Sequence, residues 1–111
     1  MSKDLESDCK KQLREMVDSY AEDANNDRMW FQHPLDNGYS RYEAYSTRYT
    51  IDGDGTYLGV QVMLAGGGPT VWLDTYQEEI CGYWGSDKYT RIISDFEYID
   101  EYWEEMYKCL S

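Results

Sequence analysis

The sequence has no long apolar run, and this absence excludes a membrane-spanning helix. Such a helix needs about 20 mainly apolar residues, and the 111-residue chain contains no such stretch. The N-terminus, MSKDLESDCKK, is polar from its first residues and has no apolar signal-peptide segment. We therefore expect one soluble, intracellular domain over residues 1–111.

Basic residues are also scarce. The chain has 10 Lys and Arg against 22 Asp and Glu, a net charge of −12. Phosphates would be repelled by this surface, which argues against binding DNA, RNA or an anionic membrane. Disordered acidic chains lack aromatic residues, whereas this one has 12 Tyr, 4 Trp and 2 Phe. We therefore expect a folded domain. Either its partner is basic, or its acidic residues serve only to keep the protein soluble.

Cysteine and histidine are too few for the common metal and disulfide frameworks. Cys9, Cys81 and Cys109 cannot all pair within one chain and show no CxxC spacing. We expect reduced, partly buried thiols, with a disulfide-linked dimer as the alternative. His33, the one histidine, cannot form a two-histidine site alone. A Cys–His pair in a small hydrolase stays open as a remote option.

Two glycine-containing segments lack the residues that ligand-binding loops need. An EF-hand loop starting at Asp52 needs glycine and glutamate where the chain has Tyr57 and Met63. A phosphate-binding loop needs Lys-Ser/Thr and a helix after Gly66-Gly67-Gly68, where Pro69 and a predicted strand follow. The segment 52–55 is instead predicted to be a hairpin turn. No catalytic residue, cofactor or metal ion is predicted, so we expect a protein that is not an enzyme.

Apolar residues at spacings of three and four predict a helix near each end of the chain. The first covers residues 4–26, ends near Asn25-Asn26 and has this stripe: Leu5, Cys9, Leu13, Met16, Val17, Tyr20 and Ala24. The second begins at a Ser94 or Asp95 cap and has this stripe: Phe96, Ile99, Trp103, Met106 and Leu110. Between the first helix and residue 38 we expect an irregular connection that Trp30-Phe31 anchors to the core, ending in the turn Asp36-Asn37-Gly38.

Four strands are predicted between the helices, at residues 39–51 and 56–64 and in a hairpin between Gly66 and Gly85. Residues 56–64 alternate, with Leu58, Val60, Val62 and Leu64 on one face and Tyr57 on the other. Short turns join all four strands, so we expect an antiparallel meander. The predicted fold is α+β, in the order α-β-β-β-β-α, with both helices on one face of the sheet.

The turn of the hairpin decides which aromatic residues are buried. A two-residue turn at Gln77-Glu78 pairs Trp72 with Tyr83. It groups Val71, Leu73, Ile80 and Trp84 on one face and Trp72, Asp74, Cys81 and Tyr83 on the other. A three-residue loop would break this grouping.

Two features are candidate partner-binding sites. The last helix has four glutamates opposite its core stripe: Glu97, Glu101, Glu104 and Glu105. Carboxylates four residues apart are separated by about 6 Å along a helix, which is similar to the spacing of phosphates along a nucleic-acid strand. The alternative is that these glutamates only form a solvated surface of an acidic protein. Trp72 and Tyr83, beside Asp74 and Asp87, have the composition of an interface hot spot, unless Trp30-Phe31 covers them.

The segment GGGPTVWLDTYQEEICGYWGSDK, followed by DEYWEEMY, resembles small acidic proteins of phages and conjugative elements of Gram-positive bacteria. The resemblance covers the C-terminal half and implies a counter-defence role, either anti-CRISPR or antirestriction, in the cytoplasm of the bacterial host cell. Its target would be a basic nucleic-acid-binding protein, a Cas effector or a restriction enzyme.

Two functional hypotheses follow. In the first, the chain is a non-enzymatic inhibitor that mimics DNA with the four helix glutamates, Asp74 and Asp87, while Trp72 and Tyr83 supply the anchor. In the second, it is a structural or regulatory module that forms a homodimer, or binds a neutral partner, through its aromatic sheet face.

Overall fold

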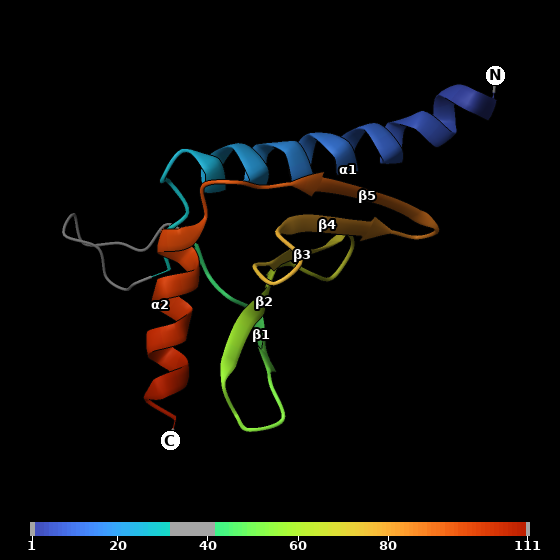
Figure 1. Cartoon of the computed structure of the whole chain (residues 1–111). Helices are drawn as coiled ribbons and strands as arrows, with labels where there is room; N and C mark the ends of the chain where they lie inside the picture. The colour runs from blue at the N-terminus through green and yellow to red at the C-terminus, as the bar shows by residue number, and fades with distance from the viewer. Residues whose placement is uncertain (1, 32–41, 111) are drawn as a thin grey trace.

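The computed structural model describes residues 2–31 and 42–110, with side chains from residue 8 onward. Figure 1 shows its elements: α1 (Ser2–Asn25), β1 (Ser46–Ile51), β2 (Tyr57–Ala65), β3 (Thr70–Asp74), β4 (Glu79–Trp84), β5 (Asp87–Ile92) and α2 (Glu97–Lys108). His33, the predicted turn at 36–38 and the first residues of the predicted strand 39–51 lie outside the described residues. None of the described helices is both long and apolar enough to cross a membrane.

The strands form one antiparallel sheet in chain order, β1-β2-β3-β4-β5. The predicted α+β class and both helices are confirmed, whereas the expected four strands become five. Gly85, at a φ of 62°, helps to form the tight turn after β4, and Trp84 pairs with Asp87 across it. Tyr89, Thr90 and Ile92 favour strands, but the polar residues Ser86-Asp87-Lys88 before them are typical of a loop, so the sequence pattern did not predict a fifth strand.

The hairpin of β3 and β4 has a longer turn than predicted, over residues 75–78. Trp72 pairs with Cys81 and Tyr83 pairs with Thr70, so the expected pairing of Trp72 with Tyr83 is wrong by two residues. A shift of two leaves each side chain on its original face. The predicted grouping is therefore confirmed, and the face that carries Val71, Leu73 and Ile80 is buried: all three are fully inaccessible.

A register irregularity between Thr50 and Ile51 interrupts the pairing of β1 with β2. Beyond it the alternation of β2 is as predicted, and Val60, Val62 and Leu64 are buried. Leu58, which was predicted to share their face, is 41% exposed and does not share their burial. Tyr57 is half-buried and its hydroxyl reaches α2, so it lies on the helix side and not on the predicted opposite face.

Both helices cover the same face of the sheet, α1 across β4 and β5 and α2 against β2 (Figure 1). The stripe of α1 is buried at Leu13, Val17 and Ala24, but Cys9 is exposed. The stripe of α2 is buried at Phe96, Ile99 and Trp103 only. Met106 and Leu110 are 42% and 72% exposed, so the last two positions of the predicted stripe do not join the core.

The start of α2 also differs from the prediction. Its N-cap is Phe96, with no side-chain cap hydrogen bond, so capping by Ser94 or Asp95 is wrong. The backbone N–H groups of Ser94 and Asp95 instead donate to Asn25 Oδ1 at the end of α1, at 2.8 and 3.2 Å. A side chain at the end of the first helix thus positions the start of the second.

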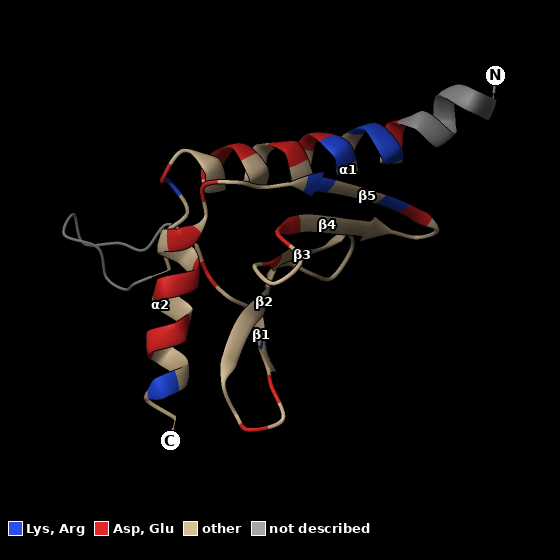
Figure 2. Cartoon of the chain, in the orientation of Figure 1, with Lys and Arg blue, Asp and Glu red and all other residues tan. Residues whose placement is uncertain are grey.

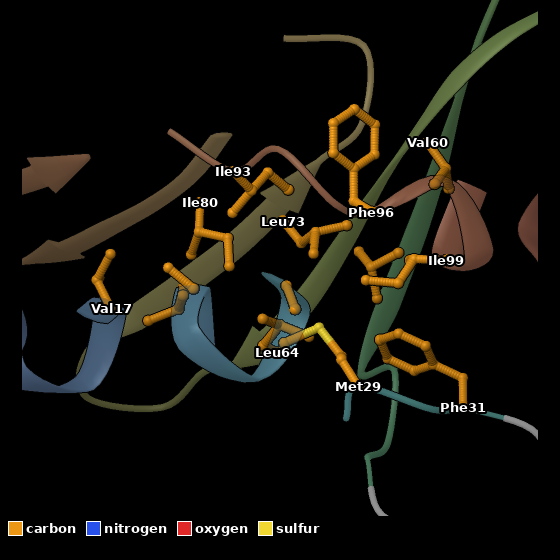
Figure 3. Close-up of a cluster of buried hydrophobic side chains, with 14 of the residues drawn as sticks. Val17, Met29, Phe31, Val60, Leu64, Leu73, Ile80, Ile93, Phe96 and Ile99 are labelled. Carbon is orange, nitrogen blue, oxygen red and sulfur yellow. The ribbon is translucent and has the colours of Figure 1, made fainter. Parts of the chain in front are cut away.

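One hydrophobic cluster joins the two helices, the sheet and the segment after α1 (Figure 3). Met29 is inaccessible and Phe31 is 7% exposed, and the Phe31 ring lies 5.4 Å from that of Trp103. Trp30 packs on Tyr98, with ring centroids 4.9 Å apart. The predicted anchoring of Trp30-Phe31 is confirmed, and these rings lie among the helices rather than on the opposite sheet face.

Gly82 permits the close approach of α1 to β4. A Cβ at this position would lie 2.7 Å from Val17 Cγ2 and 2.8 Å from Leu13 Cδ1. We expect Gly82→Ala to lower the free energy of unfolding by about 1–3 kcal/mol through overpacking, measured by urea denaturation. Gly53→Ala is the matched control, because a Cβ there meets nothing within 4 Å. Equal effects of the two substitutions would contradict this account of the packing.

Candidate functional site

The outward face of α2 brings together the four predicted glutamates. Glu97, Glu101 and Glu105 are exposed and Glu104 is half-buried, and Figure 2 shows acidic residues on successive turns of α2. Their spacing places the four on one face, which forms a negative stripe along the helix. Lys108 lies at its C-terminal end, 3.7 Å from Glu104 and 3.8 Å from Glu105. These ion pairs are largely exposed and therefore weak, so most of the negative charge stays available to a partner.

Asp100 determines which way this stripe faces. Its Oδ1 accepts hydrogen bonds from the Tyr57 and Thr75 hydroxyls, both at 2.7 Å. The buried Thr75 hydroxyl also accepts from the Val60 backbone N–H at 2.9 Å. Burial, together with the bond to Asp100, raises the pKa of the Tyr57 phenol. The phenol therefore stays a hydrogen-bond donor, and α2 is tied to β2 and to the turn after β3.

Two further tyrosines hold the ends of α2. The Tyr98 hydroxyl donates to the Ala24 carbonyl at 2.8 Å and accepts from the Met29 N–H at 3.1 Å. At the other end, the Tyr107 hydroxyl donates to the Gly55 carbonyl at 2.6 Å. The helix is thus attached to α1 at its start and to the β1–β2 turn at its end.

The β1–β2 turn adds two exposed carboxylates near the end of α2 that were predicted only as turn residues. Asp52 Oδ1 accepts from the Gly53 N–H at 2.8 Å, and Asp54 Oδ1 accepts from the N–H and hydroxyl of Thr56. These contacts confirm the predicted turn, and the bond from the Thr56 hydroxyl lowers the pKa of Asp54. Asp54 therefore stays ionised, and its charge is available beside α2.

Asp74 lies apart from the acidic stripe and has a structural role. It is 8% exposed. Its Oδ1 accepts from the Tyr76 and Gln77 N–H groups, both at 2.9 Å, and its Oδ2 accepts from Gln61 Nε2 at 3.1 Å. With both oxygens engaged, Asp74 closes the β3–β4 turn and has little exposed surface for contact with a partner.

Asp87 also lies apart from the stripe. It begins β5 at the hairpin turn, where it pairs with Trp84. Alternation along β5 places it on the same face as Tyr89 and Arg91, which bond Asp18 of α1 at 3.1 and 2.7 Å. The structure therefore separates Asp87 from α2 and also from the face that carries Trp72.

Trp72 and Tyr83 lie together on the opposite sheet face, which no described residue beyond the sheet and its turns covers. Arg48 packs over the Trp72 ring at 4.9 Å, and Lys88 lies 5.7 Å from the centre of the Tyr83 ring. A shallow hollow of about 210 Å³ opens here, lined by Arg48, Gln61, Trp72, Asp74, Glu79, Cys81 and Tyr83. The register of the strands brings these residues together; Arg48 and Glu79 are additions that the separate strand patterns could not indicate.

The three thiols differ in their surroundings. Cys81 is buried beneath the sheet-face aromatics and accepts a hydrogen bond from Thr90 Oγ1 at 3.2 Å. The hydrogen bond between the Cys81 thiol and the Tyr83 phenol raises the pKa of Tyr83. Cys9 and Cys109 are exposed, so the expectation of partial burial is wrong for these two, and all three are unpaired in the structure.

In residues 2–31 and 42–110, no three His, Cys, Asp or Glu side chains are grouped closely enough to hold a metal ion. The features that remain are two candidate binding surfaces on opposite sides of the sheet: the acidic stripe of α2 and the aromatic open face. Comparisons with protein-family models, curated proteins and solved structures found no match for this chain.

We expect Asp100→Ala to lower the free energy of unfolding by about 1–3 kcal/mol, because it leaves the Tyr57 and Thr75 hydroxyls without their shared acceptor. Glu101→Ala, at the exposed neighbouring position, removes the same charge and should have little effect. Urea denaturation of the two variants measures the difference. The described role of Asp100 is contradicted if both variants unfold at the same urea concentration.

Proposed function

We propose that this protein is a non-enzymatic inhibitor in the bacterial cytoplasm that binds the basic nucleic-acid-binding surface of a defence nuclease. A Cas effector is the favoured target and a restriction enzyme the next. The observation that supports the proposal is the outward face of α2, where Glu97, Glu101, Glu104 and Glu105 lie together in line.

The spacing of these carboxylates suits a site that binds phosphates. Residues four apart on a helix rise by about 6 Å, and the stripe from Glu97 to Glu105 in α2 therefore extends over about 12 Å. Asp52 and Asp54 extend the negative region at the end of α2. Asp74 and Asp87 take no part in it, and Trp72 and Tyr83 lie on the other side of the sheet.

The buried contacts that hold α2 do not involve the stripe, which supports a role in binding. Like charges three or four residues apart destabilise a helix by about 0.2–0.5 kcal/mol per pair. The core contacts of α2 come from Ile99 and Trp103, and its tie to the sheet comes from Asp100. The four glutamates make none of these contacts.

The net charge of −12 favours a cationic partner and repels nucleic acid itself. Electrostatic steering would raise the association rate with a basic groove and would weaken as salt is added. The resemblance of the hairpin and the terminal helix to phage and mobile-element proteins favours a defence nuclease over other basic proteins. Binding there would exclude the DNA that the nuclease must read.

The test compares two variants that each lose four negative charges. The first replaces Glu97, Glu101, Glu104 and Glu105 with glutamine. The control replaces exposed acids outside α2, as Asp8→Asn, Glu15→Gln, Glu22→Gln and Glu43→Gln. Each protein is used to capture partners from bacterial lysate at about 0.1 M and about 1 M salt, and is then assayed for inhibition of DNA cleavage by guide-loaded Cas effectors.

We expect the α2 variant to lose capture and inhibition at least about tenfold relative to the control, since it removes the charges that pair with the groove. Lys108→Gln should have the opposite effect and strengthen binding, because it removes the base beside Glu104 and Glu105. High salt should release the partner from the unaltered protein. Equal binding by the α2 variant and the control would rule out the proposal.

A further inference from the structure

The open face of the sheet differs in charge from the rest of the molecule. Its described residues carry two bases, Arg48 and Lys88, and two acids, Asp74 and Glu79, by the strand register. The face is therefore electroneutral in a chain of net charge −12. It also holds Trp72, together with Tyr83 and Ile92, which are 43% and 75% exposed. Neutral, aromatic surface is typical of the core of a protein interface.

We propose that this face binds a second copy of the same chain, sheet against sheet. Two acidic molecules repel over most of their surfaces, and this is the broad described face on which they can meet without that penalty. The proposal is independent of the inhibitor function, because it uses the side of the sheet away from α2.

The positions of the charges select the arrangement of the two copies. Arg48, Gln61, Asp74, Glu79 and Ile92 form one row across the sheet, from β1 to β5. A two-fold axis along the central β3 places β1 over β5 and β2 over β4 of the partner. Arg48 then lies over Ile92 of the partner subunit and within reach of Glu79 of the partner subunit. An axis across the strands would instead bring the two copies of Arg48 together.

The remaining charges are compatible with this packing. Asp74 lies near the axis, but its two oxygens already accept three hydrogen bonds within its own chain. Lys88 is placed over the Tyr83 ring. The hollow between Arg48 and Glu79 leaves room for a partner side chain, and Ile92, the most exposed large apolar residue of the face, becomes covered.

The size of the face predicts a weak dimer. Strands about 4.8 Å apart make a five-stranded sheet about 24 Å wide, and strands of five or six residues are about 17–20 Å long. The footprint is therefore about 400–480 Å² per copy, at the low end of specific interfaces. We expect association in the micromolar range and not a permanent dimer.

Sedimentation velocity from about 1 μM to about 1 mM protein tests the proposal. The unaltered chain should shift from monomer to dimer. Ile92→Lys should weaken the dimer at least about tenfold, because it buries a positive charge opposite Arg48 of the partner subunit. Leu110→Lys is the matched control, because Leu110 is 72% exposed, compared with 75% for Ile92, and lies beyond the end of α2; it should leave association unchanged.

A charge exchange tests the arrangement itself. Arg48→Glu and Glu79→Arg should each weaken self-association at least about tenfold, because like charges then meet across the axis. An equimolar mixture of the two variants should associate as the unaltered chain does, because both contacts in the mixed dimer again join opposite charges. Thermal unfolding by circular dichroism confirms that each variant is folded. A monomer at every concentration, equal weakening by Leu110→Lys, or no recovery on mixing would each overturn the proposal.

Discussion

The hydrogen bonds of Asp100 are the contact on which the functional geometry depends. One carboxylate oxygen joins α2 to a phenol at the start of β2 and to a threonine hydroxyl that itself bonds the β2 backbone. Because α2 is a single helix, its orientation determines the direction of every glutamate it carries. A rotation of α2 by one residue would turn the acidic stripe through about 100° and break this contact. Folding and the presentation of charge are therefore coupled at one side chain.

The parts of the fold that depend on local periodicity could be predicted from the sequence. Both helices, the β1–β2 turn and the side-chain grouping of the β3–β4 hairpin follow from spacing and turn residues. The fifth strand could not be separated from a loop, because Ser86-Asp87-Lys88 is polar and only the following residues favour a strand. The predicted pairing of Trp72 with Tyr83 was wrong because the side chain of Asp74 stabilises a longer turn through hydrogen bonds to the backbone. The strand pattern does not reveal such a contact.

The candidate site was predictable in the same partial way. Helical spacing alone places the four glutamates on one face of α2, and strand alternation alone places Trp72 and Tyr83 together. Which carboxylates belong with α2 depends on long-range packing, so Asp74 and Asp87 were grouped with it although the structure puts them elsewhere. The contribution of Arg48 and Glu79 to the open face depends on the register of neighbouring strands, which local sequence does not contain.

The two sides of the sheet separate two kinds of surface chemistry. The helix-covered side ends in a charged stripe that suits long-range attraction, and the open side offers neutral, aromatic area that acts only at contact. If the negative charge of the α2 stripe were spread over the open face, it would hinder self-association there. Their separation lets a strongly acidic chain keep a surface on which apolar contact is possible.

The attachment of α2 through its inner face alone has an evolutionary consequence. Residues that hold the helix, such as Asp100 and Trp103, are distinct from those that face outward, so outward positions can change with little effect on folding. New charge patterns could then arise by single substitutions on an unchanged scaffold. If the surface of a binding partner changes during evolution, substitutions on the outward face of α2 could restore complementarity to it while the sheet beneath the helix stays constant.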